Sequence, residues 1–136
     1  MRRGSDDLRW VEVRGFIRAR DVVDRLPKIL TVKEALLLQR LAPKPLLLRL
    51  DPAHIYPVSG FPALTYEVTN LILLNRYSHE NLDNYKHPIT GAPISKEEVY
   101  AWWERIAGKV QWDRLQCLRE SLSDGLYNTV TESSSA

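Results

Sequence analysis

The spacing of apolar side chains predicts a helix that starts near residue 14. Four apolar residues recur on one helical face, and arginines occupy the opposite face. Pro27 follows as a stop signal, because proline cannot continue a helix. The four residues of the expected buried face are Phe16, Ala19, Val23 and Leu26.

A second helix is predicted from Thr31 to about Ala42. Thr31 and Glu34 form a Thr-x-x-Glu capping box, and Pro43 ends the helix. Leucines leave little of this helix polar, which is typical of a helix in a core or an interface. Residues 14–42 therefore predict a basic helix-turn-helix pair.

Prolines change the pattern after the second helix. Residues 43–62 contain five of them, so no continuous helix can form there. We expect an ordered, extended crossing loop anchored by the apolar residues between the prolines; a simple linker is the alternative. Residues 63–78 again show helical spacing, with apolar side chains on two faces, as in a central helix.

The last long segment predicts one helix with a break. Ser95 and Glu98 form a second capping box. The apolar stripe of this helix shifts further along, so we expect a kink near Gly108–Asp113. The whole pattern predicts an all-α single domain that ends in a helical bundle. Its expected parts are a charged arm (1–13), the basic helix-turn-helix (14–42), a Pro-rich crossing loop (43–62), the bundle (63–131) and a flexible tail (132–136).

Positive charge gathers in the first part of the chain. Residues 1–50 hold twelve Lys or Arg against six Asp or Glu, whereas residues 51–136 hold seven against eleven. Arginine binds phosphate oxygens in pairs and releases counterions, so this end predicts contact with a nucleic-acid backbone. The alternative is a solvated helix face that Asp21 and Asp24 help to neutralise. The predicted backbone-binding residues are Arg2, Arg3, Arg9, Arg14, Arg18, Arg20, Arg25, Lys28 and Lys33.

Composition argues against several other classes of protein. The single cysteine, Cys117, excludes an intrachain disulfide and is expected at a core position. No apolar run is long enough to cross a bilayer, so we expect no integral membrane segment. No catalytic motif and no metal-binding spacing is present, so we expect no enzyme, metal, cofactor or small-molecule ligand. A hydrolase that uses the loop between His79 and His87 is an outlying alternative.

Apolar surface exceeds what four short helices can hide from one another, which predicts an oligomer. The tryptophans of the last helix have acidic neighbours, which favours core packing or a subunit contact over base stacking. The predicted subunit interface comprises Leu37, Leu41, Tyr66, Leu73, Tyr77, Trp102, Trp103 and Trp112.

A charged arm, a basic helix-turn-helix pair and a C-terminal bundle within 136 residues resemble in layout the major coat proteins of filamentous archaeal viruses. The resemblance implies that two chains, identical or paralogous, form a compact dimer. It also implies that the N-terminal helices wrap double-stranded DNA held in A-form, while the bundles build the outer wall. Arg14, Arg18, Arg25 and Lys28 would then line the DNA channel, and the Trp-rich helix would make wall contacts.

The sequence thus predicts a structural DNA-packaging protein. It would be a virion coat subunit that binds the duplex backbone without sequence specificity and self-assembles into a filament. Its place would be the virion, the host cytoplasm during assembly, or otherwise the cytoplasm. The alternative is a small helical subunit or adaptor of a larger protein or ribonucleoprotein complex, in which the leucine-rich faces meet partner proteins.

Overall fold

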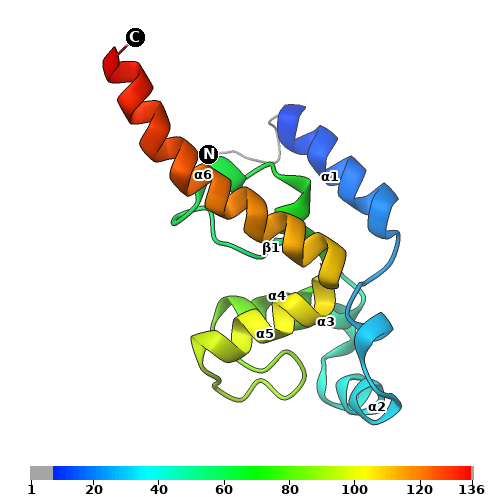
Figure 1. Cartoon of the computed structure of the whole chain (residues 1–136). Coiled ribbons are helices and arrows are strands. Elements are labelled where there is room, and N and C mark those ends of the chain that lie inside the picture. Colours follow the sequence, from blue (N-terminus) through cyan, green and yellow to red (C-terminus); the bar gives the residue numbers. More distant parts are fainter. Residues whose placement is uncertain (1–7, 136) are drawn as a thin grey trace.

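The computed structural model describes residues 8–135, with side chains from residue 8 to residue 122. This part of the chain forms a mixed α/β structure that is mostly helical (Figure 1). The helices are α1 (Leu8–Asp21), α2 (Val32–Leu41), α3 (Lys44–Leu47), α4 (Arg76–Asp83), α5 (Lys96–Ala107) and α6 (Lys109–Ser135). The strands are β1 (Leu50–His54) and β2 (Leu71–Asn75), and short 3₁₀ turns lie at η2 (Pro27–Ile29), η3 (Pro62–Leu64) and η4 (Val68–Asn70).

The two strands show that the expected all-α fold is wrong. β1 lies in the segment expected as a crossing loop, and β2 lies in the segment expected as a central helix of the bundle. Every residue of β2 is buried. A short, wholly apolar run does not distinguish a buried strand from a buried helix by its periodicity, and this ambiguity caused the error.

β1 and β2 form an antiparallel sheet in which Leu50 lies opposite Asn75. α1 packs on one face of the sheet, where Ile17 contacts Leu71 and Leu73. The other face joins the main core under α4, α5 and α6. Residues in that core include Ala53, Ile72, Leu74, Leu82, Val99, Trp103, Ile106 and Leu115.

In the described residues, the outer edge of β2 meets side chains and the backbone of Arg25 instead of a third strand. Asp21 Oδ2 accepts a hydrogen bond from the Leu73 N–H at 2.8 Å, and the Arg25 N–H donates to the Leu73 carbonyl at 2.9 Å. The guanidinium group of Arg20 donates to the Leu71 carbonyl. These bonds satisfy backbone groups that water cannot reach in a buried strand.

Asp21 is the centre of a buried ionic network. Its side chain is 2% exposed and accepts from Arg20 Nε at 2.7 Å and Arg25 Nη1 at 3.0 Å. Arg25 also donates to Gln111 Oε1 at 3.0 Å and to the Ala107 carbonyl at 2.7 Å. One carboxylate therefore ties the end of α1 to β2 and to the junction of α5 and α6.

β1 is the exposed edge of the sheet. The Ile55 N–H donates to the Asn70 carbonyl and the Arg76 N–H donates to the Arg49 carbonyl, so odd-numbered residues of this strand face β2. The backbone of Pro52 therefore points outward, where the missing N–H costs no ladder bond. This outer edge of β1 borders the candidate site.

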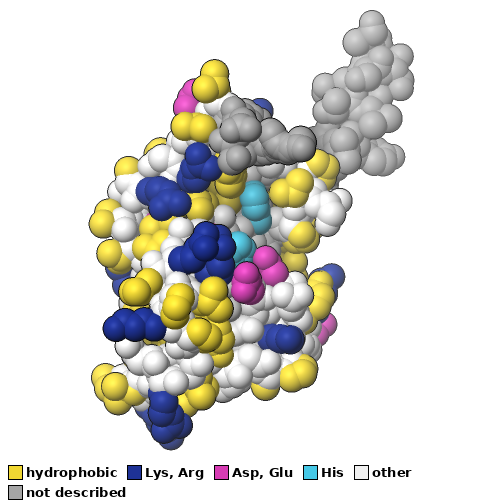
Figure 2. Space-filling view, turned by 180° about the vertical axis from the view of Figure 1, so that it is seen from behind, with side chains coloured by type: hydrophobic (Ala, Val, Ile, Leu, Met, Phe, Trp, Pro, Cys, Tyr) yellow, Lys and Arg dark blue, Asp and Glu magenta, His cyan; other side chains and the backbone are white. Residues whose placement is uncertain are grey.

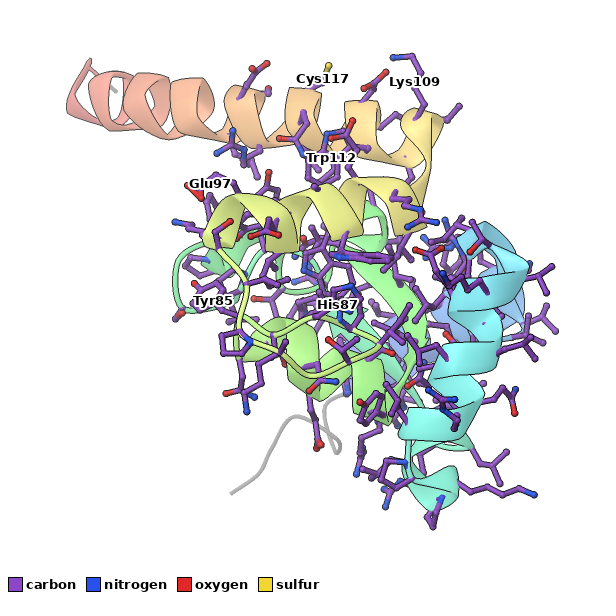
Figure 3. All side chains as sticks on the ribbon, turned by 90° about the horizontal axis from the view of Figure 1, so that it is seen from below. Tyr85, His87, Glu97, Lys109, Trp112 and Cys117 are labelled. Atoms are coloured by element: carbon purple, nitrogen blue, oxygen red, sulfur yellow. The ribbon has the colours of Figure 1, made fainter. Side chains whose placement is uncertain are left out.

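Both capping boxes and the predicted break are confirmed. Thr31 and Ser95 cap α2 and α5 with reciprocal bonds to the glutamate three residues on. Gly108, with φ of 83°, separates α5 from α6. Figure 3 shows Trp112 pointing from α6 toward α5 while Cys117 points away. Cys117 is exposed, so its expected core position is wrong.

The first helix differs from its prediction. α1 begins at Leu8, inside the expected arm, and ends at Asp21, well before Pro27. Ile17 is its fully buried apolar residue, whereas Phe16 and Val23 are 51% and 48% exposed. Of the expected buried face, Leu26 is buried in the core but lies beyond the end of α1, so the prediction is wrong for the helix itself. Among residues 8–135, no helix combines the length and apolar character that crossing a membrane requires.

The ionic network predicts a large effect of Asp21→Ala. The change removes the acceptor of the Leu73 N–H and the shared partner of Arg20 and Arg25. We expect the free energy of unfolding to fall by about 3 kcal/mol, measured by urea denaturation at neutral pH. Asp113→Ala is the control, because the pair of Asp113 with Lys109 is exposed to solvent and should contribute little to stability. Equal losses in the two variants would contradict the central role of Asp21.

The ion pair between α2 and α5 predicts a pH dependence of stability. Hydrogen bonds from Arg105 lower the pKa of Glu34 from 4.5 to about 2. A folded-state pKa below the unfolded value means that the pair stabilises the fold above pH 4.5 and that this stabilisation is lost as pH falls toward 2. Both side chains are partly exposed, so solvent screening limits the contribution to about 1 kcal/mol.

Glu34→Gln tests this dependence, because glutamine retains a capping acceptor and loses only the charge. The difference in unfolding free energy between the native protein and the variant should shrink between pH 4.5 and pH 2. A difference that stays constant over this range would exclude the ionised pair as its source.

Candidate functional site

Four arginines from three parts of the fold line one surface groove of about 440 Å³. Arg14 and Arg18 share a face of α1, because residues four apart are neighbours on a helix. Arg49 and Arg76 lie opposite each other at the end of the sheet, where the Arg76 N–H donates to the Arg49 carbonyl at 2.8 Å. We call this surface the arginine groove. Its other lining residues are Trp10, Leu50, Asp51 and Pro52.

Most of the charge in the arginine groove is not neutralised. Asp51 pairs with Arg76 through two bonds of 2.9 Å. In the part of the chain whose side chains are described, no carboxylate lies within ion-pair distance of Arg14, Arg18 or Arg49. Figure 2 shows basic side chains on this face beside histidine and acidic side chains. The groove is therefore a ready binding surface for anions.

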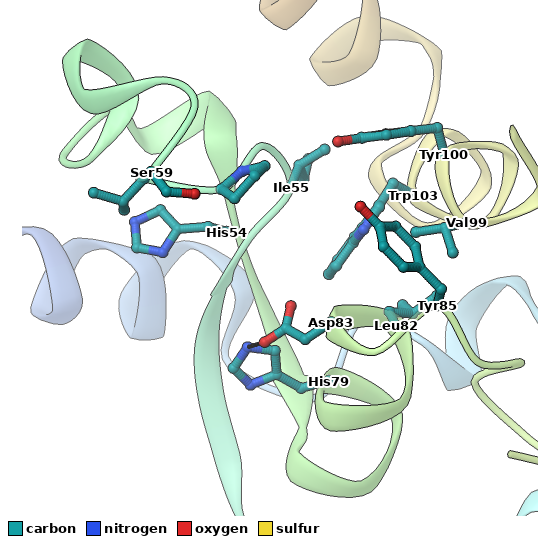
Figure 4. Close-up of a pocket in the computed structure, with 12 residues that line it drawn as sticks. His54, Ile55, Ser59, His79, Leu82, Asp83, Tyr85, Val99, Tyr100 and Trp103 are labelled. Carbon is teal, nitrogen blue, oxygen red and sulfur yellow. Dashed lines mark ion pairs between the residues drawn. The ribbon is translucent and has the colours of Figure 1, made fainter. Parts of the chain in front are cut away.

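A second cavity, of about 410 Å³, follows the groove along the outer edge of β1. Figure 4 shows His54, His79 and Asp83 on one side of it, with Tyr85 and Tyr100 on the other. We call it the aromatic cleft. Trp103, Ser59 and Ile55 also line it.

A chain of alternating charges forms the wall between the two cavities. Asp51 Oδ2 accepts from Arg76 Nε and lies 3.3 Å from His79 Nδ1, while His79 Nε2 lies 3.1 Å from Asp83 Oδ2. Burial alone would lower the pKa of His79, but hydrogen bonds and charge from Asp83 and Asp51 outweigh it and raise this pKa. The wall therefore favours a positively charged imidazole between two carboxylates.

His54 has a different environment from His79. Burial is the main influence on its imidazole and lowers its pKa, which favours the neutral ring. Its Nε2 lies 2.8 Å from the Thr65 carbonyl, and Trp10 stacks on the ring with centroids 5.8 Å apart. The contacts with Trp10 and Thr65 therefore hold the imidazole of His54 at the end of β1, where it links α1 to the aromatic cleft.

The described side chains of the two cavities show neither a serine–histidine hydrogen bond nor a metal-ligand cluster. One serine, Ser59, lines the cleft. Within the described residues, its hydroxyl group forms no hydrogen bond with a histidine. The same part of the chain contains no group of three or more His, Cys, Asp or Glu that could hold a metal ion. Anion binding in the groove and ring binding in the cleft are the chemistry that the described side chains supply.

The arginines predicted to contact a nucleic-acid backbone have different surroundings in the structure. Arg14 and Arg18 line the arginine groove, whereas Arg20 and Arg25 direct their guanidinium groups to Asp21 inside the fold. Arg9 lies over the ring of Tyr66 at 4.5 Å.

The remaining predicted cations lie away from the groove or outside the described residues. Lys28 and Lys33 are exposed on η2 and α2, which Figure 1 shows at a distance from α1. Arg2 and Arg3 lie outside the described residues. Sequence reasoning missed Arg49 and Arg76, because only the register of β1 and β2 brings them beside α1.

The eight residues predicted at a subunit interface differ in how deeply they are buried. Leu73 and Trp103 are buried in the core of the chain itself. Tyr77 donates to the Ile89 carbonyl, and Trp112 packs near Tyr56. Leu41 is 42% exposed and accessible to a partner. The others, Leu37, Tyr66 and Trp102, are partly buried.

No protein-family model matches this chain, and no curated protein or solved structure matches it significantly.

Proposed function

We propose that the protein binds the sugar–phosphate backbone of DNA through the arginine groove, without sequence preference. The observation that carries the proposal is the convergence of Arg14, Arg18 and Arg49, none of which has a carboxylate partner in the described residues. Guanidinium groups form paired hydrogen bonds with phosphate oxygens, and each contact releases counterions.

The position of the cations favours phosphates over base edges. Ile17 is fully buried beneath α1, so this helix lies against the sheet and presents its side to a ligand. Base readout in a duplex needs a helix or a strand ribbon that enters the major groove. Arginines on a surface groove instead position a backbone, which carries no sequence information directly.

The wider proposal is a virion coat subunit that packages duplex DNA and assembles into a filament. Its support is the exposed apolar surface of α2 and the segment after α3, where Val32, Leu36 and Leu48 are 78%, 65% and 69% exposed. Val32 and Leu36 lie one turn apart on α2, and exposed apolar surface is found at contact sites. Such surface also suits an adaptor in a larger complex, so DNA binding and filament formation distinguish the two functions.

A charge-reversal variant tests the arginine groove. Arg14→Glu, Arg18→Glu and Arg49→Glu together should weaken binding to long random-sequence duplex DNA about 100-fold at low salt. The slope of log affinity against log salt should fall by about 2 to 3, because each lost phosphate contact contributes about 0.9. Fluorescence anisotropy at several salt concentrations measures the affinity and its salt dependence. Electron microscopy tests separately whether the protein forms filaments.

A matched control separates the groove from overall charge. Lys28→Glu, Lys33→Glu and Arg40→Glu change the net charge equally, and all three residues are exposed on η2 or α2. This control should bind nearly as the native protein does. Equal loss in both triple variants would remove the groove from the proposal. Weak binding by the native protein at every salt concentration would reject backbone binding and favour the adaptor.

A further inference from the structure

The aromatic cleft has the size and wall chemistry of a site for a planar ring. Its volume of about 410 Å³ falls in the range of small-ligand sites. Tyr85 is 50% exposed, and Tyr100 is partly exposed on α5. Figure 4 shows both tyrosines across the cleft from the two histidines. Aromatic walls of this type bind other rings by stacking.

The cleft and the arginine groove are neighbours along one strand. Asp51 lines the groove and His54 lines the cleft. The rise along the strand places the Cα atoms of these two residues about 10 Å apart. The contact between Asp51 and His79 makes their shared wall. An extended nucleic-acid strand that follows the edge of β1 would therefore meet cations first and aromatic rings next.

We infer that the aromatic cleft receives one unpaired base while the arginine groove holds the neighbouring phosphates. This inference rests on the proposed backbone binding and deepens it, because it adds a site for an unpaired or extruded base beside the surface that holds the phosphates. In a duplex, stacked neighbours cover both faces of each base, so only an unpaired or extruded base can enter a cleft. Stacking on aromatic side chains tolerates any base, since each has a π-face.

The polar groups of the cleft suit the edge of a base. The Asp83 side chain is 54% exposed and accepts hydrogen bonds, and every base carries an N–H donor on its pairing edge. Asp83 would repel a phosphate, but Asp83 Oδ2 lies 3.1 Å from His79 Nε2, and this contact raises the pKa of His79 against the effect of burial. A protonated His79 ring offsets the charge of Asp83. Phosphates are therefore favoured in the groove and a neutral base in the cleft.

Abasic oligonucleotides separate base binding from backbone binding. A short thymidine oligonucleotide and an abasic strand of equal length carry the same phosphates. The native protein should bind the thymidine strand about tenfold more tightly, because one stacked base adds that much affinity. Tyr85→Ala should abolish this preference and leave affinity for the abasic strand unchanged, whereas Tyr85→Phe should retain it.

Phe16→Ala is the matched control, because Phe16 is 51% exposed and lies outside the cleft. It should retain the tenfold preference. Tyr100→Leu tests the same wall from α5, and circular dichroism checks that each variant folds. If Tyr85→Ala does not fold, Tyr100→Leu replaces it. The affinities of the native protein and of Tyr100→Leu for the thymidine and abasic oligonucleotides then test whether a base binds in the cleft.

The outcomes distinguish this inference from the proposed function. Equal affinity of the native protein for the thymidine and abasic strands would overturn base binding in the cleft and leave backbone binding in place. Failure to bind either strand would overturn the backbone proposal and the inference that rests on it. A preference that survives in both Tyr85→Ala and Tyr100→Leu would place the base elsewhere and also overturn the inference.

Discussion

A buried strand with one neighbouring strand leaves a row of backbone groups without partners, and this fold depends on how they are satisfied. β2 has no exposed residue, so water cannot hydrogen-bond to its outer edge. Asp21 accepts from the Leu73 N–H, and Arg20 and Gln111 donate to the Leu71 carbonyl. Burial alone would raise the pKa of Asp21, but these surroundings, above all the hydrogen bonds from Arg20 and Leu73, lower it. The carboxylate therefore remains charged within the fold.

The same network fixes where the arginine groove forms. It holds the end of α1 against β2, and this places Arg18 and Arg14, about one and two turns earlier, beside the end of β1. Arg49 and Arg76 reach the groove because the antiparallel register sets them opposite each other. A binding surface built from distant segments thus depends on a few buried polar contacts.

Local signals in the sequence predicted local structure well. The capping boxes at Thr31 and Ser95 and the break at Gly108 each depend on residues a few positions apart, and all three are present. The end of α1 could not be predicted in this way. Val22 has φ of 66°, a strained conformation for a β-branched residue, although the helical pattern continues toward Pro27. The contacts of Asp21 with β2 outweigh the local preference, and no sequence pattern near Val22 shows those contacts.

The candidate site was predictable only in part, because net charge does not reveal how each cation is used. Arg18 and Arg20 are equally basic in the sequence, yet Arg18 lines the groove and Arg20 serves the edge of β2. The arginine groove and the aromatic cleft both border β1, although cations line the groove and the carboxylate of Asp83 on α4 lines the cleft. Arg76 and His79 bracket Asp51, and His79 also offsets Asp83. Asp51 and Asp83 thus have partners of their own, and within the described residues neither forms an ion pair with Arg14, Arg18 or Arg49.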